Sequence, residues 1–397
     1  MMTNVSRREF VGEALAACAM PLAGCVSSAG GGRSVKFLLM ADHHVESDFM
    51  EGGRPCYTMW RAGNHAALAK TYEFISSDPY CRDIDFALFC GDQLNTGCAN
   101  QPERLREERT NYYRTLESLE LYRKTKGKDV SDLDFHSPES FFVCGDRPKG
   151  YVQRPIPFKK LDSRVVAIQG NHDTAVEDFY RECSFKCGDT RFITFFASYV
   201  GLPAPKGQFR STARISDEAV AFVEKEMSAA RADPTIRHIV LASHWTIVHG
   251  DQNFKWPIFD ACKENGFSDN RRRIIALAEK YGCDLFINGH EHNPDYPVGK
   301  AGSMSVINCG SVAAPASRDA FEDESGTFAI VEINDNRAVF NVYSRAIAKE
   351  GANGEIHYLQ LPSRRFTREI ALKPYPGPGI MGAHETVVKR PLAHYKG

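Results

Sequence analysis

Aspartate, histidine and asparagine residues follow five separate apolar runs of this 397-residue chain, each directly after the run ends. Their carboxylate, imidazole and amide groups suit divalent ions such as Mn, Fe, Zn or Ni, and do not form a thiolate site. In chain order the runs end in Asp42-His43-His44, Gly91-Asp92, Gly170-Asn171-His172-Asp173, Ser243-His244 and Gly289-His290-Glu291-His292. The pattern predicts one metal centre assembled from five places in the chain.

The apolar runs have the length of β-strands, and amphipathic helices are predicted between them. One helix is expected to carry Leu68 and Tyr72 on a single face. Another is expected to begin at an N-cap, Ser216, with Val220 and Val223 on its buried face. Because the carboxyl ends of parallel strands converge on one edge of an α/β sheet, we expect the polar residues to meet there.

The ordered set D-x-H, GD-x-x-N, GNHD, a lone histidine after a strand, and GHEH resembles the calcineurin-like metallophosphoesterase superfamily. The resemblance covers about residues 35–311. It implies a metallo-dependent phosphatase-like α/β fold of four layers, an α/β/β/α sandwich with two mixed sheets in the centre. It also implies a hydrolase that cleaves a phosphodiester or phosphomonoester by means of a hydroxide bridging two divalent metal ions.

The resemblance further implies two sets of ligands that share one carboxylate. These are Asp42, His44 and His292 for the first ion, Asn171, His244 and His290 for the second, and Asp92 for both. His172 is implied to be the catalytic residue, as a general acid or as a stabiliser of phosphoryl charge. Asp173 is implied to orient a histidine or a loop amide from behind the ligands.

Two positions need separate comment. Asn95 stands where the protein phosphatases of this superfamily have an aspartate that pairs with the catalytic histidine. An asparagine can accept a hydrogen bond from His172 but cannot stabilise an imidazolium as a carboxylate would.

Asp146, in "FFVCGDRP", is an alternative to Asp92 as the shared metal ligand, since it also follows an apolar run. Asp92 is preferred because Asn95 completes its GD-x-x-N motif and because Arg147-Pro148 indicates a turn after Asp146.

Residues 1–33 are predicted to be an export leader and not part of the fold. Arg7 and Arg8 followed by an alanine-rich apolar stretch resemble a twin-arginine signal, and "LAGC" resembles a lipobox that ends at Cys25. The alternative is a disordered leader with a chance Leu-Ala-Gly-Cys. The first interpretation predicts an exported protein of a bacterium, periplasmic or tethered to a membrane through a lipidated Cys25.

The remaining chain is divided into a metallophosphoesterase domain at 34–345, with an insertion at about 96–163, and a C-terminal extension at 346–397. The formal net charge of −1 gives no reason to expect a nucleic acid partner. The expected partner is a small phosphate-ester substrate. Cys183 and Cys187 can form a disulfide, or they can lie one helical turn apart.

Two neighbours of the proposed ligands are given ordinary structural roles. His43 is expected to lie in the core or to be bonded to the backbone, and Glu291 is expected to face solvent. A different class of function also remains open, a non-catalytic metal- or ligand-binding lipoprotein on the same scaffold. That alternative predicts missing ligands, and all seven proposed ligand positions carry a suitable side chain.

Overall fold

The computed structural model describes residues 34–45, 50–51, 54–55, 64–81, 84–95, 102–117, 165–174, 179–202, 210–247, 268–312, 326–350, 353 and 355–373. Every described residue belongs to one compact unit, Gly32–Gly397. The predicted leader with Cys25, the alternative Asp146 and most of the predicted insertion lie outside the described residues. Within the described ranges, no helix has the length and hydrophobicity needed to cross a membrane.

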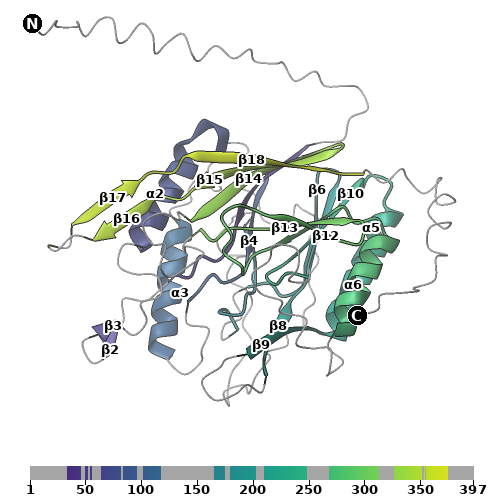
Figure 1. Ribbon diagram of the computed structural model, residues 1–397, viewed down its shortest axis with the longest axis horizontal. Helices are drawn as coiled ribbons and strands as arrows, with labels where there is room; N and C mark the ends of the chain where they lie inside the picture. Colours follow the sequence, from purple (N-terminus) through teal and green to yellow (C-terminus); the bar gives the residue numbers. More distant parts are fainter. Residues whose placement is uncertain are drawn as a thin grey trace, which may run out of the picture. The chain divides into compact units, whose positions relative to one another are not determined.

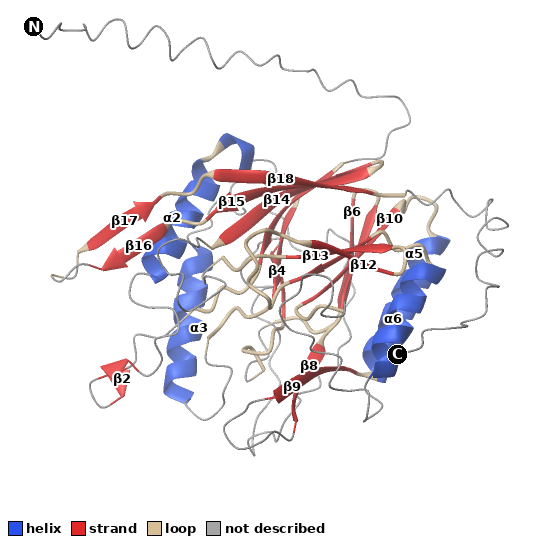
Figure 2. Cartoon of the chain, viewed as in Figure 1, coloured by secondary structure: helices blue, strands red, loops and turns tan. Residues whose placement is uncertain are grey.

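Two six-stranded sheets form the centre of the fold (Figure 1, Figure 2). In the first sheet the parallel strands β1, β4 and β5 are extended by antiparallel strands β14, β15 and β18, in the order β18-β15-β14-β1-β4-β5. The bounds of these strands are Val35–Met40 (β1), Phe86–Cys90 (β4), Val165–Ile168 (β5), Thr327–Asn334 (β14), Arg337–Ser344 (β15) and Arg364–Ala371 (β18).

The second sheet has the order β12-β13-β11-β10-β7-β6. Its four central strands are parallel, and its two edge strands are antiparallel to their neighbours. The bounds are Cys183–Cys187 (β6), Thr190–Thr194 (β7), His238–Ser243 (β10), Leu285–Asn288 (β11), Val298–Ala301 (β12) and Met304–Asn308 (β13). Both sheets are therefore mixed, as the sequence predicts.

Helices cover the outer face of each sheet. Helices α2 (Asn64–Ser77) and α3 (Pro102–Glu117) contribute Tyr72 and Tyr112 to the core cluster that contains β1 and β4. Helices α5 (Asp217–Ala232) and α6 (Ser268–Lys280) pack in a second cluster with β10 and β11. The order helix, sheet, sheet, helix confirms the four-layer α/β/β/α sandwich.

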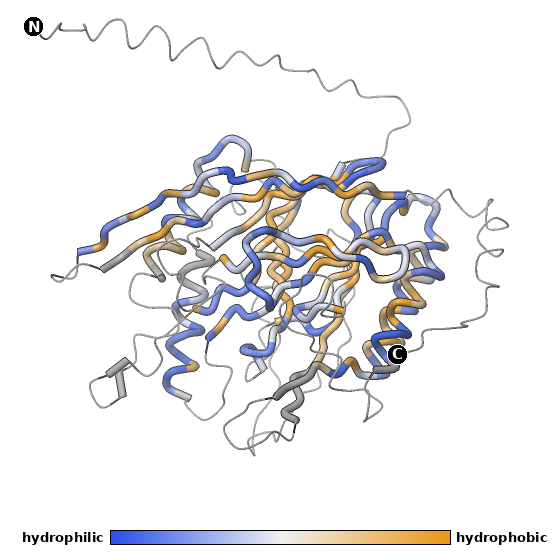
Figure 3. The backbone as a smooth tube through the Cα atoms, viewed as in Figure 1, coloured by the Kyte–Doolittle hydropathy of each residue, from blue (hydrophilic) through white to orange (hydrophobic). Residues whose placement is uncertain are grey.

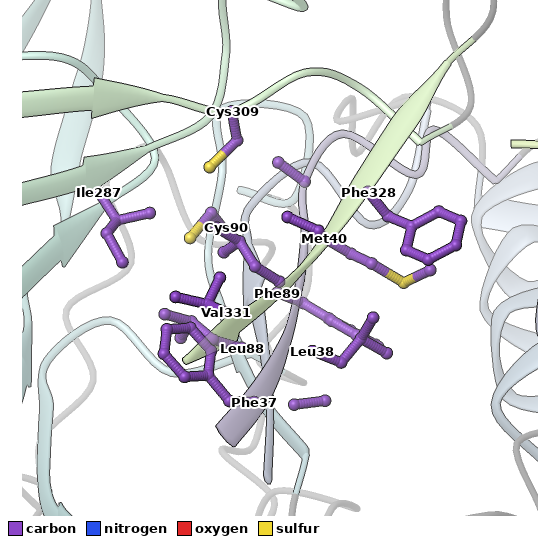
Figure 4. Packing of buried hydrophobic residues seen from close by; sticks show 14 of the residues in the cluster. Phe37, Leu38, Met40, Leu88, Phe89, Cys90, Ile287, Cys309, Phe328 and Val331 are labelled. Carbon is purple, nitrogen blue, oxygen red and sulfur yellow. The ribbon is translucent and has the colours of Figure 1, made fainter. Parts of the chain in front are cut away.

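Aromatic rings fill the space between the two sheets. Phe37 of β1 stacks on Phe86 of β4 with ring centroids 4.9 Å apart, and Phe86 meets Phe192 of β7 at 4.9 Å. Phe185 of β6 stacks on Phe192 at 5.1 Å. Figure 3 shows the hydrophobic residues concentrated along the central strands, and Figure 4 shows the β1, β4 and β14 side chains packed beside Ile287 and Cys309. Burial of these rings is a main driving force for joining the sheets.

The predicted start of helix α5 is confirmed. The Ser216 hydroxyl accepts a hydrogen bond from Ala219 N at 3.1 Å, and Asp217 and Glu218 occupy the first turn. Strands β14 and β15 form a hairpin, with Asn334 and Arg337 as its closing pair.

Other segments differ from the sequence-based expectation. Cys183 and Cys187 are the ends of strand β6 and both are free cysteines, so neither the helical turn nor the disulfide is present. Within the predicted C-terminal extension, β18 completes an edge of the first sheet. The smaller elements are β2 (Met50–Glu51) with β3 (Arg54–Pro55), β8 (Ala197–Leu202) with β9 (Arg210–Ile215), β16 (Ile347–Glu350) with β17 (Ile356–Gln360), and the 3₁₀ helix η1 (Pro79–Cys81).

Candidate metal centre

The predicted site residues follow the carboxyl ends of five parallel strands, three in the first sheet and two in the second. Asp42 and His44 follow β1, Asp92 follows β4, Asn171, His172 and Asp173 follow β5, His244 follows β10, and His290 and His292 follow β11. The donor atoms of seven of them, all but Asn171 and Asp173, form three groups, each with all its atoms within 4.8 Å of one another. The polar residues therefore converge at the carboxyl ends of the parallel strands, as expected for an α/β sheet, but they come from two sheets and not one.

The first group joins Asp42, His44 and His292. His292 Nε2 lies 3.2 Å from Asp42 Oδ1 and 3.1 Å from His44 Nε2. Asp42 and His44 are buried, with exposed fractions of 0% and 1%. Two imidazole nitrogens and a carboxylate oxygen in such close contact form a donor set suited to a divalent cation.

The second group is centred on the ring of His244. Its Nε2 lies 3.0 Å from Asn171 Oδ1, 3.2 Å from Asp92 Oδ2 and 3.2 Å from His290 Nδ1. Its other nitrogen, Nδ1, lies 2.9 Å from the carbonyl oxygen of Cys90. Because a carbonyl can only accept, Nδ1 carries a proton, and Nε2 has a lone pair whenever the ring is in its neutral form.

The donor set around His244 Nε2 fits a bound cation. With the proton on Nδ1, lone pairs of His244, Asn171 and Asp92 point at one small volume, which is unfavourable unless a positive charge lies among them. Burial alone lowers the pKa of His244, but the carboxylates of Asp92 and Asp42 raise it to about 10. The surroundings therefore stabilise positive charge at this point.

Asp92 lies between the two groups. Its Oδ2 is 3.2 Å from His244 Nε2 and 3.8 Å from His44 Nε2, and its Oδ1 accepts the backbone N–H of His172 at 2.8 Å. Burial raises the pKa of Asp92, yet the neighbouring imidazoles of His244 and His172 hold it well below its usual value. An ionised carboxylate in this position is suited to bridging two ions.

The backbone at the centre is unusual. Six non-glycine residues in the described ranges have positive φ, and five of them are candidate ligands: Asp42 (54°), His44 (42°), Asp92 (51°), His290 (72°) and His292 (50°). Left-handed conformations at residues other than glycine cost about 1–3 kcal/mol and are concentrated at functional sites. At Gly91, φ is 85° and a Cβ would lie 2.3 Å from His244 Nδ1, so only glycine fits beside this ring.

His172 lies at the edge of the same cluster. Its donor atom groups with those of His44 and Asp92, and its ring centroid is 4.8 Å from that of His44. His172 Nδ1 lies 2.6 Å from the backbone carbonyl oxygen of Asn95. The hydrogen bond expected between these two residues therefore involves the main chain of Asn95.

Asp173 joins two of the loops that carry candidate ligands. Its Oδ1 accepts the N–H of Leu94 at 2.9 Å, and its Oδ2 accepts those of Gly170 at 2.9 Å and Gln93 at 3.1 Å. Burial and the nearby charge of Asp92 raise the pKa of Asp173 to about 7, against the effect of these backbone donors. Asp173 thus orients loop amides, which is one of the two roles the sequence suggests.

His43 is buried and lies among aromatic rings, as expected, with its ring centroid 4.6 Å from that of Phe89. Burial lowers its pKa to about 3, so the ring is neutral. The prediction that Glu291 faces solvent is wrong, because only 5% of this residue is exposed. Glu291 lies after the end of β11, where the alternation of a strand no longer predicts which way a side chain points.

Two further residues contact candidate ligands. The ring of Trp245 lies over that of His290 with centroids 3.9 Å apart, and it is 1% exposed. Ser311 Oγ donates to the carbonyl oxygen of Asp42 at 2.8 Å. Because Trp245 directly follows His244 in the sequence, its packing near the candidate ligands can be predicted. No local sequence pattern connects Ser311 with Asp42.

Comparison with protein families gives a match over residues 35–294 to the family model described as calcineurin-like phosphoesterase. Among solved structures, a predicted phosphoesterase of Streptococcus pneumoniae is 12% identical with a TM-score of 0.27, covering 85% of this chain and 99% of that one. Vps29 of Entamoeba histolytica, crystallised with zinc, is 12% identical with a TM-score of 0.31, covering 85% and 100%. NAD nucleotidase of Haemophilus influenzae is 12% identical with a TM-score of 0.34, covering 83% of this chain and 54% of that one. No curated protein sequence matches the chain.

Proposed function

Because this chain belongs to the calcineurin-like phosphoesterase family, we propose that it hydrolyses phosphodiesters or small phosphomonoesters at a centre of two divalent metal ions. The observation that carries the proposal is the pair of donor groups that share Asp92. One group contains His44 and the other contains His244, so the carboxylate lies beside an imidazole on each side.

The proposed ligands combine the donor group of Asp42, His44 and His292 with the donor group of Asp92, His244 and His290, and Asn171 is added because its Oδ1 lies 3.0 Å from His244 Nε2. Asp42, His44 and His292 hold the first ion, Asn171, His244 and His290 hold the second, and Asp92 binds both. Mixed oxygen and imidazole donors suit Mn, Fe, Zn or Ni. When bound, two such ions supply Lewis acidity toward the phosphoryl oxygens and lower the pKa of water.

His172 is the proposed catalytic residue. Its Nδ1 proton is held by the Asn95 carbonyl, which fixes the ring. A second proton, carried on Nε2 in the imidazolium form, would pass to the leaving oxygen and leave the ring neutral. A neutral carbonyl fixes the tautomer without adding the charge of a carboxylate. Asp173 holds the backbone before His172 and after Asp92 through three N–H groups, which keeps the spacing of these two residues constant.

The leader supports a proposal about location. The twin-arginine pattern at Arg7 and Arg8 and the lipobox-like "LAGC" favour export and attachment to a membrane through a lipid on Cys25. In a bacterial host, the wild-type protein is expected in the membrane fraction and Cys25→Ser in the soluble periplasmic fraction. Wild-type protein that remains in the cytoplasm would contradict the proposal.

Hydrolysis of nitrophenyl phosphate mono- and diesters, measured with Mn or Zn added, tests the function. His290→Ala is expected to lose bound metal and activity together. His357→Ala is the matched control, since His357 is an exposed histidine on β17. If wild-type protein cleaves neither ester and His290→Ala keeps its metal content, the chain is a binding protein on this scaffold. If the wild-type protein does cleave an ester, a panel of phosphomonoesters, cyclic nucleotides and phospholipid head groups identifies the substrate class.

A further inference from the structure

The peptide unit that joins Gly289 to His290 is held at both of its polar atoms. Its N–H, on His290, donates to Asp42 Oδ2 at 3.0 Å and to Oδ1 at 3.2 Å. Its carbonyl oxygen, on Gly289, accepts from Asn288 Nδ2 at 2.9 Å, from Asn308 Nδ2 at 3.2 Å and from Glu291 N at 2.9 Å. The N–H is thus bound to the first sheet and the carbonyl to the second.

The two asparagines are neighbours by the register of the second sheet. Asn288 is the last residue of β11 and Asn308 the last of β13, and the two are direct partners in this parallel pair. Paired positions of parallel strands place their side chains on the same face, so both amides reach the same carbonyl. Both residues are fully buried.

The amide oxygens of these residues give independent support. Neither Asn288 Oδ1 nor Asn308 Oδ1 has a hydrogen-bond partner among the described residues. Burying an amide with its oxygen unpaired is unfavourable, and an apolar residue of similar size would avoid that penalty. An asparagine that served only to fill the core would therefore be a poor choice here, at two paired positions.

Gly289 also packs against the carboxyl ends of β1 and β4 in the first sheet. A Cβ on this residue would lie 2.6 Å from the Cys90 carbonyl oxygen and 2.9 Å from Asp42 Oδ2. Rotation of the Gly289–His290 peptide would point its carbonyl oxygen at the carboxylate of Asp42, and its N–H at the donors of the two asparagines. The asparagine amides favour the orientation in which Asp42 receives a donor.

We propose that Asn288 and Asn308 are positioning residues that set the affinity of the centre for metal ions by fixing the orientation of the Gly289–His290 peptide. Through this peptide they hold Asp42 against His292, whose Nε2 lies 3.2 Å from Asp42 Oδ1. They also hold the turn in which His290 and His292 have left-handed backbones. The inference rests on the proposed function for the identity of the ligand, a divalent ion, and its test requires no turnover.

The test is calorimetric titration of the full chain with Mn²⁺ and absorption spectroscopy with Co²⁺. Asn288→Ala and Asn308→Ala are each expected to weaken Mn²⁺ binding about 10- to 100-fold, the usual effect of removing a group that orients ligands. Asn308→Asp keeps the size of the side chain but turns an oxygen toward the Gly289 carbonyl, so its loss of affinity is expected to be at least as large. The Co²⁺ absorption bands are expected to shift in all three variants.

Asn341→Ala is the matched control. Asn341 is a buried asparagine of β15 whose Nδ2 donates to Tyr80 Oη at 2.6 Å, and it contacts no candidate ligand among the described residues. This variant is expected to lose stability and keep its affinity for Mn²⁺.

Folded variants at Asn288 and Asn308 that bind Mn²⁺ within twofold of the wild type would overturn the inference. If all three variants fail to fold while Asn341→Ala folds, the amides serve folding and the inference also fails. A wild-type protein that binds Mn²⁺ but cleaves no phosphate ester removes the proposed function and leaves this inference standing. The two failures are therefore distinguishable.

Discussion

The Nδ1 atom of His172 lies 2.6 Å from the backbone carbonyl oxygen of Asn95, so the histidine is held by the main chain. The identity of residue 95 therefore affects His172 only indirectly. A sequence motif describes which side chains are present. It does not describe the path of the backbone, and the position of His172 depends on that path.

Substitutions at the two residues are expected to have unequal effects. His172→Ala should lower kcat about 10²- to 10⁴-fold, the usual contribution of a general acid. Asn95→Ala keeps the carbonyl and should lower kcat far less. The metal content of each variant, measured alongside kcat, decides the role of His172. This second measurement is needed because the donor atom of His172 also lies within 4.8 Å of those of His44 and Asp92. Loss of metal in His172→Ala would identify a ligand instead of an acid.

Asp92→Asn is expected to be more damaging than the loss of a ligand from one group. The carboxylate lies near imidazoles of both groups, and an amide of the same shape removes its charge from both. Bound metal, measured by elemental analysis, should fall further than in His290→Ala, and kcat should fall at least about 10²-fold. Equal metal loss in the two variants would argue against a shared carboxylate.

A buried ion pair outside the centre predicts a change in stability alone. Arg191 Nη2 lies 2.8 Å from Glu226 Oε2, joining β7 to α5, and both side chains are at most 5% exposed. Glu226→Gln should lower the free energy of unfolding by about 3–5 kcal/mol, because Arg191 keeps a buried charge without its partner. Urea denaturation measures the change, and metal binding should stay the same.

The control for that experiment is an exposed pair. Arg337 and Glu369 on β15 and β18 are about half exposed and 3.4 Å apart. Arg337→Ala should change stability by less than about 1 kcal/mol. Similar losses in Glu226→Gln and Arg337→Ala would show that burial of the first pair has no energetic consequence.

Asp233 predicts a dependence of stability on pH. Hydrogen bonds from Thr235 and Lys186 lower the pKa of Asp233 to about 2. Since the folded-state pKa is below the unfolded value of about 3.9, the contribution of Asp233 to stability is present above pH about 4 and is lost as the pH falls toward 2. Asp233→Asn should be less stable than the wild type at pH 6, and the difference should shrink at pH 3. A difference that is constant between these two values would contradict the assignment.

Much of the fold follows from sequence pattern. Apolar runs of strand length, such as Phe86–Cys90, correspond to buried strands, and the cap at Ser216 fixes the start of α5. The β6–β7 hairpin was not predicted, because a four-residue spacing of cysteines fits a helix as well as a strand. The edge strand β18 was not predicted either. Its exposed positions carry polar residues with little alternation, and its pairing with β15 is decided by contacts distant in sequence.

For the site, residue type and position after a strand were enough to select a set that the structure brings together. The residues that support this set were harder to find. Asn288 and Asn308 act through a carbonyl that they share only because β11 and β13 are in register, and Ser311 reaches Asp42 across 269 positions of the chain. Such contacts depend on the folded backbone, which short motifs do not encode.

The left-handed backbones at Asp42, His44, Asp92, His290 and His292 have a consequence for ion exchange. The strain of these five residues is expected to be overcome when the core forms, through the packing of the two six-stranded sheets and the helices of the described ranges, and not each time an ion arrives. Binding and release of the metal ion are therefore expected to be independent of folding. A chelator should leave a folded, reloadable protein, and the ion that occupies the centre would then follow the supply of metals where the protein works.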